Sequence, residues 1–188
     1  MSEECESLVK VEGSDVYFYC PVDELSVLEF NMKVRTLCND LRKTWIDFGI
    51  EGKPRIRVFI RSDGGDIFSG LSAMDCLKSL AKHVDVVTVA DGVCASAATF
   101  ILLGGSSRQM TENSFVLIHQ LNTDGFWGKF EEVKDEMKNL TMYMQRFKDI
   151  YNRETDLPEA KLKKLIKRDL YLDANKCLKY RIVDLLFT

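Results

Sequence analysis

The stretch VDVVTVADGVCASAATFILLGG, residues 84–105, decides the fold of this chain. Its first part, 84–90, is rich in valine and is followed by Asp-Gly, which is typical of a buried strand. The apolar run 97–103 stops at a Gly-Gly pair and predicts a short buried helix. Ser96 therefore lies at a turn from strand to helix. Unpaired backbone N–H groups and the positive end of the helix dipole at such a turn suit a developing oxyanion.

A histidine follows the next apolar strand. The run NSFVLIHQ, residues 113–120, predicts a strand that ends at His119. Side chains at strand ends face the crevice in which open α/β sheets place their sites. The chain has only two histidines, and the other, His83, follows a helical run where it can simply cap carbonyls. If Ser96 is a nucleophile, His119 is the natural base, because imidazole exchanges protons near neutral pH.

Each of these residues also has an ordinary structural explanation. A serine at a helix start is most often an N-cap, and a lone histidine after a strand is more often structural. A third feature adds weight to a site. The turn RSDGG, residues 61–65, follows an expected strand at 55–60, and its glycines let the backbone turn tightly and approach a ligand. The combination favours a site more than any single residue does.

In order and spacing, these segments resemble the ClpP family, the proteolytic subunits of Clp protease. The family has a strand followed by Asn-Ser-Pro-Gly-Gly, a Gly-x-Ala-Ala-Ser-Met turn, and an Asn-Ser…Ile-His-Gln-Pro strand. Near the C-terminus it has an Arg-Asp pair and then a stretch that ends in Leu/Ile-Val-Asp. This chain has RSDGG at 61–65, GVCASA at 92–97, NS…IHQL at 113–121, KRDLYL at 167–172 and IVD at 182–184. The likeness covers about residues 16–187. Asp63 and Leu121 stand where the family has proline.

The resemblance implies a Ser-His-Asp mechanism for an endopeptidase. Ser96 would be the nucleophile, His119 the general base, and Asp169 the carboxylate that orients the imidazole. The backbone N–H groups of Gly65 and Ala97 would form the oxyanion hole, where one donor is typically worth about 3 kcal/mol. Because these donors are backbone groups, alanine in place of the family's methionine at position 97 need not remove one.

A substrate is expected to bind as an added strand beside this triad. Extended peptides bind exposed strand edges through main-chain hydrogen bonds, and side-chain pockets give specificity. The segments 65–70 and 121–128 flank the predicted triad. The expected substrate-binding residues are Ile67, Phe68, Leu121, Gly125 and Phe126.

One long helix, expected at 129–154, carries a continuous apolar stripe. Its members recur at steps of three and four residues: Phe130, Val133, Met137, Leu140, Met144, Phe147 and Tyr151. The second half is expected to pack in the core of the subunit. The resemblance implies that the first half projects as a handle between two facing seven-membered rings that enclose a chamber. The expected oligomer contacts are Phe130, Val133, Met137 and Arg168, the last beside Asp169.

Alternating strands and helices predict an α/β layered fold. They are expected at 16–20, 24–48, 55–60, 69–82, 84–90, 97–103, 114–119, 129–154, 158–168 and from 173. The resemblance specifies a ClpP/crotonase-type superhelix of β-β-α units with a protruding handle helix, in one domain over 16–188. Residues 1–15 are polar and acidic and are expected to be flexible. The family usually carries a longer segment there, so docking to an AAA+ unfoldase is a weaker expectation than peptidase chemistry.

Composition excludes several other function classes. A net charge of −3 argues against a protein that binds nucleic acid or an anionic membrane surface, since such proteins carry an excess of positive charge. No apolar run has the length of a membrane span, and no signal peptide is visible. The six cysteines have neither Cys-x-x-Cys pairing nor metal-ligand spacing, which favours reduced thiols in a cytoplasmic protein and no metal or other cofactor. Cys94, close to Ser96, is expected to be a buried structural thiol.

Three other functions stay open from the sequence. A crotonase-like acyl-CoA enzyme would use the region of Gly65 and Ala97 as an oxyanion hole without a serine nucleophile. A silent ring subunit would lack triad residues. An ATP-independent processing peptidase, for example for a phage capsid precursor, would keep the chemistry without an ATPase. The ordered set of Ser96, His119 and Asp169 argues against the first two.

Overall fold

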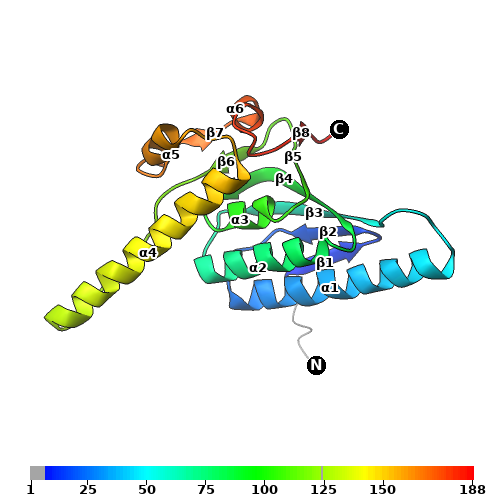
Figure 1. Ribbon diagram of the computed structural model, residues 1–188, viewed down its shortest axis with the longest axis horizontal. Coiled ribbons are helices and arrows are strands. Elements are labelled where there is room, and N and C mark those ends of the chain that lie inside the picture. The colour runs from blue at the N-terminus through cyan, green and yellow to red at the C-terminus, as the bar shows by residue number, and fades with distance from the viewer. Residues whose placement is uncertain (1–6, 124) are drawn as a thin grey trace, which may run out of the picture.

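The computed structural model describes residues 7–123 and 125–188 of the chain. The strands are β1 (Val9–Glu12), β2 (Asp15–Phe18), β3 (Arg55–Ser62), β4 (Asp85–Ala95), β5 (Ser107–Met110), β6 (Phe115–Leu117), β7 (Tyr171–Leu172) and β8 (Leu185–Leu186). The helices are α1 (Glu24–Asp47), α2 (Ile67–Leu80), α3 (Ala98–Leu103), α4 (Phe130–Glu154), α5 (Glu159–Leu165) and α6 (Ala174–Lys179). Helices α1 to α3 lie along the strands, and α4 extends away from them (Figure 1).

The sheet has the order β1-β2-β3-β4-β5-β8, and β6 and β7 branch from β4. Strands β2, β3, β4 and β5 are parallel neighbours, and β1 joins β2 in an antiparallel hairpin. A parallel sheet covered by helices suits near-continuous apolar strands. The core of β4 is of this kind, because residues 86–90 are all buried.

Strand β4 changes partners along its length. Its residues 87–90 pair with β5, whereas its residues 93–95 pair with β6. On the opposite edge, the register with β3 shifts between Ile60 and Ser62. Strand β4 thus belongs to two parts of the sheet, one with β5 and the other with β6. This change of partner fits the predicted superhelix of β-β-α units, and the predicted fold class is confirmed. The strand predicted at 84–90 therefore continues to Ala95.

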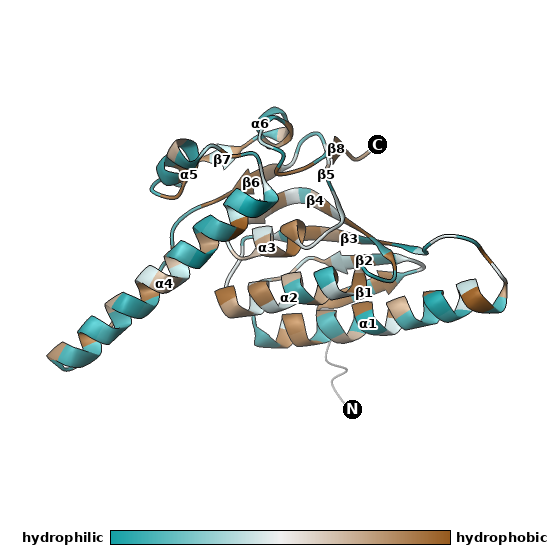
Figure 2. Cartoon of the chain, viewed as in Figure 1, coloured by the Kyte–Doolittle hydropathy of each residue, from teal (hydrophilic) through white to brown (hydrophobic). Residues whose placement is uncertain are grey.

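Side-chain caps fix where the helices of the core begin. Asp23 accepts a hydrogen bond from Ser26 N at 2.8 Å, and the Ser26 hydroxyl in turn receives one from Asp23 N at 3.0 Å. This reciprocal pair is a capping box, and it starts α1. Asp66 caps α2 through Ser69 N at 2.7 Å. Hydrophobic residues gather in α2, α3 and the central strands, whereas α4 is mostly hydrophilic (Figure 2).

Helix α4 has two different halves, as the apolar stripe predicts. Near its end Phe147 and Tyr151 are buried in the core, whereas Phe130 and Met137 near its start are 75% and 59% exposed. The exposed half projects from the body as a handle (Figure 1). The predicted core packing and the protruding handle are confirmed, and the packing of rings through this half stays a prediction.

The N-terminal prediction is wrong for residues 9–15. Strand β1 lies inside the segment 1–15 that was expected to be flexible, and Val9 in that strand has no exposed surface. Glu29 on α1 fixes the two residues before this strand, because it accepts hydrogen bonds from Ser7 Oγ at 2.6 Å and Leu8 N at 3.1 Å. Residues 1–6 of the predicted flexible segment lie outside the described residues.

Candidate active site

The candidate nucleophile lies in a tight turn with an unusual backbone conformation. Ser96 sits between β4 and α3 with φ of +53°. Residues other than glycine rarely adopt positive φ, and such strain clusters at functional sites. The turn is held by hydrogen bonds from Ser96 N to the Leu117 carbonyl, 2.9 Å, and from Thr99 N to the Ser96 carbonyl, 3.0 Å. The surrounding structure therefore determines where the serine side chain points.

The Gly-Gly turn after β3 packs against this serine turn. Val22 N donates to the Gly64 carbonyl at 2.9 Å, and Asp66 N donates to the Val22 carbonyl at 2.7 Å. A Cβ atom at Gly65 would lie 2.2 Å from the Val22 carbonyl oxygen, so no larger residue fits there. These contacts with Val22 fix the backbone of Gly65, and Gly64 before it lies against Ser96.

Residues from both turns and from the histidine strand enclose one cavity of about 320 Å³. Its lining includes six predicted site residues: Ser96, His119, Gly65, Ala97, Ile67 and Leu121. The structure thus brings together the predicted nucleophile, base, oxyanion groups and part of the substrate site. Six further lining residues were missed as site residues from the sequence, and three of them are aromatic: Phe100, Phe147 and Tyr151. Their apolar spacing indicated only that they belong to the core.

His119 follows β6, is half-buried and lines this cavity. The next residue is fixed by a hydrogen bond from Gln120 N to the Ile166 carbonyl at 2.8 Å. Over residues 7–123 and 125–188, no hydrogen bond joins Ser96 to His119. The two side chains therefore share a cavity, and the direct contact between them stays a prediction.

Asp169 is not brought into the cavity. Helix α5 ends at Leu165, earlier than the predicted 168, and leaves Arg168 and Asp169 exposed in the segment before β7. Within the described part of the chain, Asp169 makes no hydrogen bond with His119 and does not line the cavity. The described subunit therefore positions two members of the predicted triad but not the third.

Three predicted substrate residues also lie outside the cavity lining. Phe68 is 56% exposed at the start of α2, with its ring edge-to-face with Tyr143 at 5.2 Å between centroids. Gly125 and Phe126 are exposed in the segment before α4. The segment is interrupted by Asp124, which lies outside the described residues.

The thiol closest in sequence to the nucleophile is buried and protonated. Cys94 has no exposed surface, and burial raises the pKa of its thiol well above the usual range, with the neighbouring Cys177 adding to the effect. Burial likewise raises the pKa of Cys177 to about 12. Nucleophilic cysteines need the thiolate form. The structure therefore supports Cys94 as the structural thiol that the sequence predicts.

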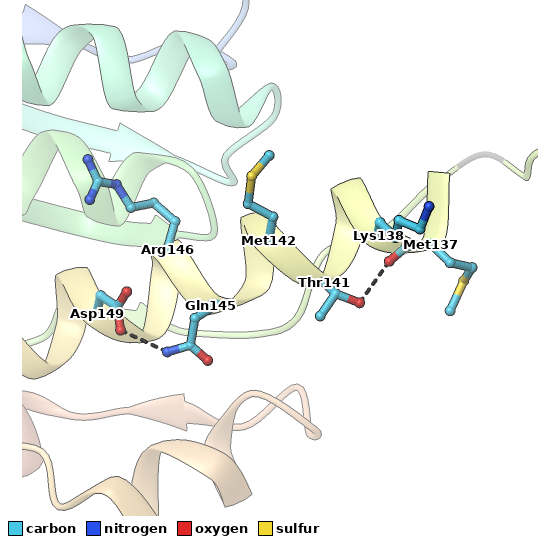
Figure 3. A pocket seen from close by; sticks show the side chains of 7 residues that line it. All are labelled: Met137, Lys138, Thr141, Met142, Gln145, Arg146 and Asp149. Carbon is cyan, nitrogen blue, oxygen red and sulfur yellow. Dashed lines mark hydrogen bonds between the residues drawn. The ribbon is translucent and has the colours of Figure 1, made fainter. Parts of the chain in front are cut away.

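A second and larger hollow, of about 700 Å³, lies along α4 and shares no lining residue with the serine cavity. Its lining residues all come from this helix (Figure 3): Met137, Lys138, Thr141, Met142, Gln145, Arg146 and Asp149. Two hydrogen bonds fix polar side chains there, from Gln145 to Asp149 at 2.8 Å and from Thr141 to the Met137 carbonyl at 2.7 Å.

Two negative findings apply to the described residues. That part of the chain contains no group of three or more His, Cys, Asp and Glu side chains that could hold a metal ion. None of the helices traced over residues 7–123 and 125–188 has the length and apolar character needed to cross a membrane.

Comparisons with known proteins place this geometry in a family. The proteolytic subunit of the ATP-dependent Clp protease of Deinococcus radiodurans is 29% identical over 131 residues, which cover 69% of this chain and 63% of that protein. The corresponding subunit of Pinus thunbergii is 30% identical over 128 residues, 67% of this chain and 64% of that protein. The chain thus matches less than two thirds of the length of these relatives.

A solved structure gives the same fold. A point mutant of ClpP1 from Listeria monocytogenes superimposes with a TM-score of 0.74 over 93% of this chain and 91% of that chain, at 22% sequence identity. The sequence model of the family described as Clp protease matches residues 49–188, a span that contains the Gly-Gly turn, Ser96, His119 and Asp169. The chain therefore belongs to the Clp protease family.

Proposed function

We propose that this chain is a serine endopeptidase of the ClpP type. Ser96 attacks the carbonyl carbon of a peptide bond, and His119 takes the hydroxyl proton and passes it to the leaving amine. The N–H groups of Gly65 and Ala97 stabilise the tetrahedral oxyanion. The observation that carries this proposal is the cavity of about 320 Å³ that Ser96, His119, Gly65 and Ala97 line together.

The proposed substrates are peptides or unfolded proteins in an extended conformation. The strand of substrate would lie between the segments 65–70 and 121–128, on either side of the serine. The cavity offers Ile67, Phe100, Leu121 and Phe147 as an apolar pocket for one side chain of the substrate. Apolar walls with few polar groups are usual for such pockets.

Assembly would complete the site. Asp169 and Arg168 are exposed beside the end of α5, and the first half of α4 exposes Phe130, Val133 and Met137. Exposed apolar patches of this kind usually mark an interface. The chain would form homo-oligomeric rings, paired as two stacked heptamers through α4. In that assembly Asp169 would reach His119, and an AAA+ unfoldase would be a candidate partner.

Membership of the Clp protease family favours a peptidase over the crotonase-like acyl-CoA enzyme. We also propose a cytoplasmic location, because the five cysteines in the described residues are free thiols and would suit a reducing compartment.

The direct test is hydrolysis of fluorogenic peptides with apolar residues before the cleaved bond. Ser96→Ala and His119→Ala should each lower kcat by at least about 10³-fold, because serine and base act as a unit. Ser72→Ala is the matched control, since Ser72 is an exposed serine on α2, away from the cavity. Full activity in Ser96→Ala together with its loss in Cys94→Ala would overturn the proposal and indicate a cysteine enzyme.

A further inference from the structure

Two buried hydroxyl groups near the serine turn have no part in the proposed chemistry: that of Thr99 contacts the turn, and that of Tyr151 contacts Thr99. Thr99 on α3 is 1% exposed, and Tyr151 on α4 is 5% exposed. Their oxygens lie 2.6 Å apart, and Thr99 Oγ1 lies 2.6 Å from the carbonyl oxygen of Ser96. The three groups form an unbroken hydrogen-bonded chain from the handle helix to the backbone of the predicted nucleophile.

The direction of this chain follows from which groups can donate. A carbonyl oxygen only accepts, so the single proton of the Thr99 hydroxyl goes to Ser96. Tyr151 must then donate to Thr99 Oγ1. Burial raises the pKa of the Tyr151 phenol well above its usual range, which keeps it in the protonated form that donates. The order of donation is therefore Tyr151 to Thr99 to the Ser96 carbonyl.

The bond to Ser96 has a consequence for the next residue. A peptide unit is planar, and in the trans form its C=O and N–H groups point in opposite directions. The carbonyl of Ser96 and the N–H of Ala97 belong to one such unit. Thr99 holds this carbonyl twice, through its hydroxyl at 2.6 Å and its backbone N–H at 3.0 Å. Fixing the carbonyl therefore fixes the direction of the Ala97 N–H, one of the proposed oxyanion donors.

Tyr151 is itself held on several sides. Its ring packs against Phe100 at 5.7 Å between centroids. Its carbonyl accepts hydrogen bonds from Thr155 Oγ1 at 2.6 Å and Thr155 N at 3.0 Å. A phenol on a rigid support can keep the Thr99 hydroxyl in one rotamer, which an isolated threonine would not do.

We propose that Tyr151 and Thr99 are positioning residues that orient the Ala97 N–H toward the oxyanion. This inference rests on the proposed peptidase function and deepens it. The two hydroxyls act through the backbone of the Ser96 turn and do not touch the substrate carbonyl. Their effect should therefore fall on the transition state and not on the binding of the substrate.

The test compares Tyr151→Phe, Thr99→Val and Thr99→Ser with the wild-type chain. Tyr151→Phe and Thr99→Val should each lower kcat by about tenfold, less than the loss of a whole oxyanion donor, and leave KM within about twofold. Thr99→Ser keeps the hydroxyl and should keep most of kcat. The double variant Tyr151→Phe/Thr99→Val should be little worse than Thr99→Val, because the two hydroxyls act in one chain.

A second readout separates positioning from stability. A peptide boronate forms a tetrahedral adduct with serine and uses the oxyanion hole, so its affinity should fall in proportion to kcat across these variants. Tyr180→Phe and Thr44→Val are the controls. Tyr180 is a half-buried tyrosine at the end of α6, and the Thr44 hydroxyl donates to the Asp40 carbonyl at 2.9 Å on α1, away from the cavity. Both controls should keep wild-type kcat and boronate affinity.

Three outcomes would overturn this inference. Unchanged kcat in Tyr151→Phe and Thr99→Val, with only a lower melting temperature, would make the pair purely structural. An equal loss in Thr99→Ser and Thr99→Val would assign the effect to the threonine methyl group. A wild-type chain that neither hydrolyses peptides nor binds the boronate would overturn the proposed function together with the positioning role of Tyr151 and Thr99. The first two results would leave the proposed peptidase function intact.

Discussion

The Cα atom of Gly64 lies so close to Ser96 that a side chain at Gly64 would collide with the serine. A Cβ atom built there falls 2.5 Å from Cβ of Ser96 and 2.7 Å from the carbonyl oxygen of Ala95. Gly64 also has φ of +98°, which a residue with a side chain rarely adopts. The Gly-Gly turn after β3 can approach the nucleophile turn only because its first residue is glycine.

This contact predicts that Gly64→Ala abolishes peptide hydrolysis. The collision must push the two turns apart, and the positive φ adds about 1 kcal/mol of strain. Gly13→Ala is the matched control, because Gly13 has φ of +59° and nothing within 4 Å of an added Cβ. It should lose only the stability that the positive φ costs, about 1 kcal/mol, and keep full kcat. Equal activity in both variants would show that the approach of the two turns is not needed.

A separate prediction concerns Cys94, which is buried beside the serine turn. Because burial raises the pKa of its thiol, the thiolate should be absent at neutral pH. Iodoacetamide should label Cys94 only after denaturation, and Cys94→Ala should keep its kcat within about threefold of wild type. Rapid labelling of Cys94 in the folded chain at pH 7, followed by loss of activity, would contradict the structural role.

Charged residues in the exposed half of α4 should disrupt assembly. Val133→Glu and Met137→Glu place a carboxylate in the proposed ring interface, where an unpaired buried charge is costly. Sedimentation should report single rings or smaller species, and kcat should fall in the same variants because Asp169 would lose its alignment. Asn139→Glu, at an exposed polar position of the same helix, should change neither. Wild-type subunits that are monomeric and fully active would refute the coupling between assembly and activity.

The C-terminal end of α4 should depend on one buried arginine for its attachment to the body of the molecule. Arg108 is 7% exposed, and it bonds to Asp184 at 3.1 Å and to the carbonyl of Glu154 at the end of α4. Removing the carboxylate in Asp184→Ala leaves this charge without its partner and should lower the free energy of unfolding by about 2–4 kcal/mol in urea titration.

A surface pair on the handle is the control for this effect. Asp135 contacts Lys138 at 2.9 Å, and both side chains are well exposed. Asp135→Ala should therefore cost less than about 1 kcal/mol in the same titration. A similar loss in the two aspartate variants would mean that Arg108 does not anchor the helix.

Much of the fold could be predicted from the sequence because its long elements have clear periodicity. Helices predicted at 24–48 and 129–154 are found at Glu24–Asp47 and Phe130–Glu154. Short strands were missed, since strands such as β7 and β8 have two residues each and form only by pairing with β6 and β5. The Asp-Gly pair after Ala90 looked like the end of a strand, but β4 continues because it acquires β6 as a new partner.

Part of the candidate site could likewise be predicted from the sequence, and part could not. Ser96 and His119 could be paired from the sequence because the chain offers few histidines, because Ser96 lies at a predicted turn from strand to helix, and because His119 ends a predicted strand. The place of Phe147 and Tyr151 in the cavity lining could not be foreseen, since apolar spacing does not distinguish a pocket wall from ordinary core. Asp169 was assigned by resemblance alone, and the described subunit leaves it exposed.

The central claim, that Ser96 is the nucleophile, is tested most directly by a fluorophosphonate probe followed by peptide mapping. A serine with an adjacent base and an oxyanion hole forms a covalent phosphonate adduct, whereas ordinary surface serines do not. The account predicts one adduct, on Ser96, which disappears in Ser96→Ala and forms slowly in His119→Ala. A chain that hydrolyses peptides but carries the adduct on another serine, or still carries it in Ser96→Ala, would contradict the account.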